Sequence, residues 1–127
     1  MEDSQDVRDA ALQFYRSLSS PDSDIPISEQ VTSVDAAAIL IGTDVKEWVQ
    51  GAQACIAAFT DQAQTGVRVE PGDVRAYAEG SIGWIVDRPT VILLDGGRIP
   101  ARLTAVYRLE DGRWRHVTSH MSIGIAD

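Results

Sequence analysis

The sequence predicts an α+β domain in which two helices precede a meander of antiparallel strands. In the first half of the chain, apolar residues recur at spacings of three and four, which is typical of amphipathic helices. In the second half, apolar and polar residues alternate, and the turn signals at 95–97 and 111–112 separate strand-like segments. A sheet of this kind cannot leave its apolar face in water, so we expect the helices to cover it.

The two helices are predicted at residues 3–19 and 44–64. In the first, the apolar face is formed by Val7, Ala11, Phe14 and Leu18. The second has Asp44 and Glu47 spaced as in a capping box, and Gly66 just beyond its end. Its apolar positions, which are expected in the core or the pocket wall, are Trp48, Ala52, Ile56 and Phe59.

The remaining elements are predicted from turn residues and from alternation. Pro21 and Pro26 delimit a polar connector, which a short helical turn at 27–32 and a buried strand at 35–43 follow. Pro89 interrupts a long strand and therefore indicates an edge or a bulge. The five strand segments predicted after the second helix cover 67–70, 73–78, 82–94, 99–109 and 113–125.

Composition indicates one globular domain over residues 1–127. Hydrophobic residues make up 44% and charged residues 24% of the chain, which is enough apolar material for a core. No apolar run reaches the roughly 18–20 residues that a membrane span needs, and the acidic start does not resemble a signal peptide. Because the chain has one cysteine, Cys55, it forms no internal disulfide. We therefore expect a cytoplasmic protein that does not interact with membranes.

The net charge of −8 argues against nucleic-acid binding, which normally requires a basic patch. No glycine-rich phosphate loop joins a strand to a helix, so we expect no nucleotide cofactor. His116 and His120 lie roughly 13 Å apart if they share one strand, too far to bind one metal ion together. We therefore expect no metal and no cofactor.

The closing strand carries the strongest candidates for a functional site. Regular alternation places Trp114, His116, Thr118, His120 and Ser122 on one face. We expect His120 to point into a hollow as an acid, a base or a hydrogen-bond donor, with Ser122 beside it. The alternative is a core histidine bonded to a carbonyl or a hydroxyl group. His116, nearer the hairpin, is expected at the surface.

Four further residues complete the expected ligand-binding set. Tyr15 is a conceivable hydrogen-bond donor from the first helix, while Trp48 and Trp84 are expected in the pocket wall. Arg102 is expected either to line the pocket or to form a cross-strand ion pair with Asp87. In the second case the two charges have a structural role.

The order of elements and three segments, 41–51, 79–87 and 101–124, resemble the SnoaL-like branch of the NTF2-like (ketosteroid-isomerase-like) superfamily. The most specific parts are Gly-Thr-Asp-x-x-Glu-Trp at 42–48 and the Trp-x5-His-x-Ser pattern that ends at Ser122. The resemblance implies a cone, in which a curved antiparallel sheet covered by N-terminal helices encloses an apolar pocket, and frequently a homodimer formed through the sheet. It implies no single activity, since the family includes isomerases, cyclases, dehydratases, epoxide hydrolases and binding modules.

Three functions therefore stay open. The first is the binding of a small apolar or polycyclic molecule, with His120 as a polar anchor. The second is acid–base catalysis of an isomerase, cyclase or hydrolase type, in which His120 carries the proton. The third is homodimerisation or another protein interaction through the exposed face of the sheet.

Overall fold

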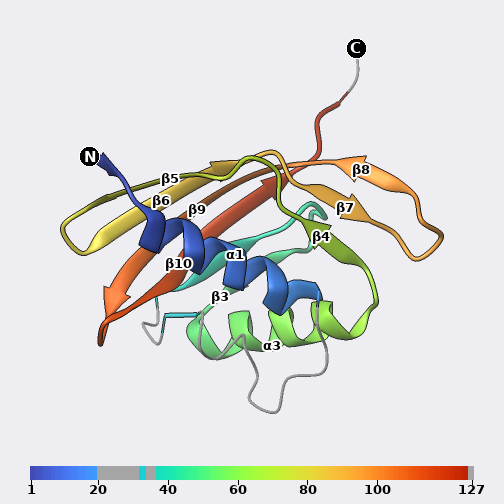
Figure 1. The fold of residues 1–127 in the computed structure, drawn as a ribbon. Helices are drawn as coiled ribbons and strands as arrows, with labels where there is room; N and C mark the ends of the chain where they lie inside the picture. Colours follow the sequence, from blue (N-terminus) through green and yellow to red (C-terminus); the bar gives the residue numbers. More distant parts are fainter. Residues whose placement is uncertain (20–31, 34–36, 126–127) are drawn as a thin grey trace.

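A computed structural model describes residues 1–19, 32–33 and 37–125 of the chain (Figure 1). The predicted connector at 21–26 and nearly all of the predicted turn at 27–32 lie outside the described residues. In chain order, the described elements are β1 (Glu2–Asp3), α1 (Gln5–Ser19), β2 (Ile39–Ile41), β3 (Trp48–Gln50), α3 (Ala52–Gln64), β4 (Arg68–Glu70), β5 (Arg75–Glu79), β6 (Ile82–Asp87), β7 (Thr90–Ile92), β8 (Arg98–Pro100), β9 (Arg102–Glu110) and β10 (Arg113–Ser122).

Seven strands form the main sheet, in the order β1-β5-β6-β9-β10-β2-β3. Its centre is the predicted meander, since β5, β6, β9 and β10 pair antiparallel with their neighbours. The predicted strand at 35–43 is observed as β2, which pairs parallel with β10, so the sheet is mixed. Figure 1 shows α1 and α3 on one side of this sheet. The α+β prediction is confirmed.

Pro89 interrupts the long predicted strand at 82–94. β6 ends at Asp87 and β7 begins at Thr90, where the chain leaves the main sheet for a three-stranded sheet of order β4-β7-β8. The backbone N–H of Ala101 donates to the Pro89 carbonyl at 2.9 Å and keeps the two sides of the hairpin together at the break. The proline therefore lies where the sequence predicts an irregularity.

The core lies between the two helices and the sheet. The four apolar residues predicted on the first helix, Val7, Ala11, Phe14 and Leu18, are all buried there. Gly83 allows α1 to lie close to β6, because a Cβ atom at this position would be 2.6 Å from a Val7 methyl group. Among the described residues, no helix is long and apolar enough to cross a membrane.

The second helix begins at Ala52, and the prediction that it starts at Asp44 is wrong. Asp44 and Glu47 do interact, through a backbone bond of 2.9 Å and a bond from the Asp44 N–H to the Glu47 carboxylate at 3.1 Å. These contacts close the turn of a β2–β3 hairpin, because the same Asp-x-x-Glu spacing suits a tight turn. Gly51 then takes a left-handed φ of 99° and redirects the chain into α3.

A β-bulge divides β10 into two segments. His116 pairs with Tyr107 of β9, but Thr118 pairs with Val106, so Val117 is an extra residue without an opposite partner. Each side chain after the bulge therefore points to the face opposite to the one that unbroken alternation predicts. His116 faces the helices, whereas His120 faces away from them. The prediction that the five alternating residues from Trp114 to Ser122 share one face is wrong.

Candidate functional site

The two faces of the main sheet differ in their polar residues. We call the side covered by α1 and α3 the enclosed face, and the opposite side the open face. Buried residues of β6 and β9 lie on the enclosed face, namely Ile85, Asp87, Leu103, Ala105 and Tyr107. Arg102, Thr104 and His120 are on the open face and are exposed.

A buried carboxylate, Asp87, is bonded to α1 across the enclosed face. The Tyr15 hydroxyl donates to its Oδ2 atom at 2.5 Å, and the backbone N–H of Gly72 donates to the same oxygen at 3.0 Å. The N–H of Arg88 donates to Oδ1 at 2.8 Å. Gly72 has no room for a side chain, because a Cβ atom would lie 2.6 Å from the Arg88 carbonyl oxygen. Three donors therefore satisfy this carboxylate.

His116 is fully buried between two phenylalanine rings. Its ring is stacked on Phe14, with centroids 5.3 Å apart, and meets the edge of Phe59 at 5.2 Å. Its Nε2 atom lies 2.8 Å from the Ser119 hydroxyl oxygen. Nδ1 has no hydrogen-bond partner among the described residues, and the same is true of the buried Tyr107 hydroxyl. Both groups thus lie without a partner in apolar surroundings, and the buried hydroxyl of Thr32, which forms a β-bridge with His116, is also unpartnered.

Burial sets the protonation states of these groups. It lowers the pKa of His116 to about 4, so the imidazole is neutral near pH 7. Burial also raises the pKa of Tyr107 well above its ordinary value. For Tyr15, burial is the main cause of a raised pKa, and the hydrogen bond to Asp87 and the nearby Tyr107 add to it. Both phenols therefore keep their protons at physiological pH.

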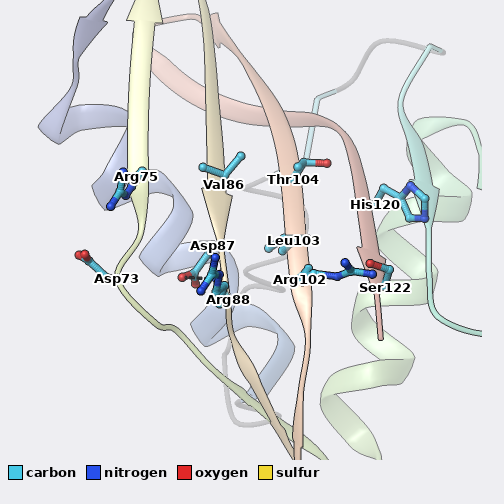
Figure 2. Close-up of a pocket in the computed structure, with 10 residues that line it drawn as sticks. All are labelled: Asp73, Arg75, Val86, Asp87, Arg88, Arg102, Leu103, Thr104, His120 and Ser122. Carbon is cyan, nitrogen blue, oxygen red and sulfur yellow. Dashed lines mark hydrogen bonds between the residues drawn. The ribbon is translucent and has the colours of Figure 1, made fainter. Parts of the chain in front are cut away.

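The open face carries a hollow of about 760 Å³ (Figure 2). One cross-strand row runs through it, because Val86 pairs with both Arg75 and Thr104, and Thr104 pairs with His120. Figure 2 shows these four side chains side by side from β5 to β10. A basic side chain lies at one end of the row and an imidazole at the other.

A second set of polar side chains lies below this row. Arg102 pairs with Ser122, and in Figure 2 its side chain extends toward Ser122. Arg88, Asp73 and Asp87 also line the hollow. Arg102 therefore occupies a central place in the hollow, between Arg75 of β5 and Arg88, which follows β6, on one side and the polar end of β10 on the other.

The structure separates the site residues expected from the sequence. The hollow contains three of them, Arg102, His120 and Ser122. Trp84 is on the open face and contacts the Tyr77 ring, with centroids 4.8 Å apart, and Thr118 belongs to the same segment of β10 as His120. Tyr15 is buried on the enclosed face, and Trp114 packs at the edge of the core.

Three expectations are wrong. Trp48 is 61% exposed on β3, because this segment is a strand and not a helix. His116 is buried and not at the surface. Asp87 and Arg102 do not form the expected cross-strand pair, since Asp87 is opposite Leu103 and bonds to Tyr15.

Sequence reasoning missed His116, Tyr107 and Ser119 as a group. The alternation on β9 places Tyr107 on the same face as Leu103 and Ala105, so the sequence contained a pattern that indicates its burial. No sequence pattern indicated the bulge at Val117, which brings Ser119 to the same face as His116. Among the described residues, no group of three or more His, Cys, Asp or Glu side chains could hold a metal ion.

Comparisons with known proteins agree with this architecture. A family model described as a SnoaL-like domain matches residues 7–126. An NTF2-like protein of unknown function from Pseudomonas putida KT2440 has 17% identity and a TM-score of 0.75, over 94% of this chain and 85% of the other. A candidate dehydratase of the NTF2-like family from Streptomyces avermitilis has 16% identity and a TM-score of 0.78, over 96% of each chain. A comparison with curated proteins finds no match.

Proposed function

Because this chain belongs to the SnoaL-like family, whose model matches residues 7–126, we propose that it binds a small, largely apolar molecule against the enclosed face of its sheet. The observation that carries the proposal is the pair of buried polar atoms without partners, Tyr107 Oη and His116 Nδ1. The described structure leaves both atoms without a hydrogen bond. A ligand oxygen that reaches them would supply one.

Energetics favour a polar partner at this place. A buried hydrogen-bonding group without a partner costs about 1–3 kcal/mol, and nearly all such groups in proteins are satisfied by protein or water. Tyr107 and His116 are both fully buried, so bulk water does not reach them. A ligand that bonds to either group recovers this free energy in addition to the gain from burying its own apolar surface.

The chemistry of the two groups defines the ligand. Tyr107 keeps its proton, so its hydroxyl donates to a carbonyl, ether or hydroxyl oxygen. His116 is neutral, and its bond to Ser119 decides whether Nδ1 donates or accepts. Phe14 and Phe59 flank the imidazole and provide apolar walls. We expect these two rings to shift when a ring-shaped ligand with one oxygen function binds.

The same groups favour binding over proton transfer. The oxygens of Asp87 are occupied by three hydrogen bonds, and His116 with a pKa near 4 is a weak base at neutral pH. An enzyme that uses His120 is the alternative. It requires a carboxylate bonded to this imidazole, and no such bond exists within the described part of the chain. We therefore propose that the protein binds a ligand and does not catalyse proton transfer. We also propose that it acts in the cytoplasm, in keeping with the free, buried thiol of Cys55.

A thermal-shift screen with steroid ketones and aromatic polyketides tests the proposal. A compound that raises the Tm of the wild type should lose most of this effect in Tyr107→Phe. The unliganded Tyr107→Phe protein should be as stable as the wild type or more stable, since the change removes an unpartnered hydroxyl. Tyr77→Phe, on the open face, is the matched control and should respond like the wild type. Equal ligand shifts in all three proteins would show that the site is elsewhere.

Self-association through the open face is a second candidate. Trp84 and Tyr77 form an aromatic pair on this face, and Ile82 of the same strand is 45% exposed. Aromatic residues are enriched at protein interfaces. Light scattering at micromolar concentration should then give a dimer for the wild type and a monomer for Trp84→Glu. A monomeric wild type would exclude this role.

A further inference from the structure

We propose that the hollow on the open face is a separate binding site for a small organic acid, with Arg102 as its main anchor. The site lies on the side of the sheet opposite Tyr107 and His116, so it does not depend on the function proposed above. Its ligand is a molecule with one carboxylate or phosphate group and a flat body. The lining residues that matter are Arg75, Arg88, Arg102, Thr104 and His120.

The charges in the hollow are unbalanced in favour of an anion. The chain has 11 basic residues against 19 acidic ones, yet three arginines line this one hollow. Of the two carboxylates of the lining, Asp87 accepts the three hydrogen bonds described above, and Asp73 offsets one of the three arginine charges, so the lining keeps a surplus of positive charge. The described residues provide no ion pair for the side chains of Arg75, Arg88 or Arg102.

The geometry suits a molecule of moderate size. Four neighbouring strands contribute the row from Arg75 to His120, which therefore spans about 14 Å at roughly 4.8 Å per strand. The middle of the row, Val86 and Thr104, offers a shallow floor on which a flat ring system can lie. Arg102 and Ser122 stand beside this floor and present a guanidinium and a hydroxyl to an acid group. The volume of about 760 Å³ is within the roughly 300–1,000 Å³ of small-molecule sites.

The overall charge restricts the ligand further. A chain of net charge −8 repels extended polyanions, so a nucleic acid is a poor candidate for the same arginines. A single anionic group needs only the local field of the hollow, where a guanidinium can bind a carboxylate or phosphate with two parallel hydrogen bonds. His120 can donate an N–H to the same ligand in either protonation state.

Two-dimensional NMR titration with a matched pair of probes tests this site. The probes are 1-naphthoate and its neutral amide, 1-naphthamide, which share one ring system and differ in charge. We expect naphthoate to shift the backbone resonances around Arg102 and His120 and to bind at least about tenfold more tightly than naphthamide. Inorganic phosphate should compete with naphthoate, and added salt should weaken both anions.

Arg102→Gln should reduce naphthoate affinity about tenfold or more, whereas Arg68→Gln should leave it unchanged. Arg68 is an exposed arginine of β4 outside the hollow, so the two variants change the net charge equally. Equal losses in both variants, or equal affinities for the two probes, would show that binding is not specific to this site. Resonances of the hollow that move with protein concentration but not with naphthoate would identify the hollow as a self-association surface and overturn the proposal.

Discussion

His116 and His120 lie four residues apart on one strand, yet they occupy opposite environments. His116 is fully buried on the enclosed face, packs between Phe14 and Phe59 and bonds to Ser119. His120 is exposed on the open face and lines a hollow with three arginines. The extra residue Val117 causes the difference, because it shifts the pairing of β10 with β9 between the two histidines.

The comparison shows how one bulge gives a strand two kinds of site. Before Val117, the imidazole of His116 is buried and forms part of the core. After Val117, the side chains of Thr118, His120 and Ser122 point away from the core. Water can solvate a charged group on that side at little cost in free energy, and a ligand can bind there without displacing packed rings. On the enclosed face, packing determines which hydrogen bonds a buried polar group can form. On the open face, a polar group needs no protein partner because water solvates it.

The largest expected effect is on stability. His116→Ala should lower the free energy of unfolding by about 3–4 kcal/mol, because it removes a packed ring from the core and leaves Ser119 without its imidazole partner. His120→Ala should change it by less than about 0.5 kcal/mol, as is usual for exposed positions. Urea unfolding of both variants measures the contrast. Similar losses in the two would mean that the faces are not as different as their burial indicates.

A pH dependence of stability is the next effect in size. The pKa of His116 is about 4 in the folded protein and near 6.5 when unfolded, so between these values the unfolded state binds the proton more strongly. Stability from this residue is therefore complete above pH 6.5, falls by about 3 kcal/mol as the pH is lowered to 4, and is constant below that.

Unfolding followed by urea at several pH values, with His116→Phe and His120→Ala as the comparison pair, isolates this contribution. The fall between pH 6.5 and 4 should become smaller in His116→Phe, which cannot titrate there, and should persist in His120→Ala. A fall of the same size in His116→Phe would assign the pH dependence to other groups.

Much of the fold was predictable because its signals are local. Periodic apolar residues identified α1, and turn residues identified the strands of the meander. The site was harder to predict from the sequence, because its residues are brought together by pairing between distant segments. The register that places Asp87 opposite Leu103, and the bulge that separates His116 from His120, both follow from contacts with other strands. The Asp44–Glu47 spacing failed for a related reason, because it serves a tight turn as well as a helix start.

The smallest of these effects tests the bond that joins the two faces. Asp87 lines the hollow on one side of the sheet and accepts the Tyr15 hydroxyl from α1 on the other. Tyr15→Phe removes one of three donors to a buried carboxylate, so it should lower the free energy of unfolding by about 1–2 kcal/mol. Tyr77→Phe, whose ring lies on the open face, should have almost no effect. Because Asp87 keeps the N–H donors of Gly72 and Arg88, naphthoate binding in the hollow should survive in Tyr15→Phe. A loss of naphthoate binding in this variant would show that the enclosed face positions the hollow, and that the two sites are coupled.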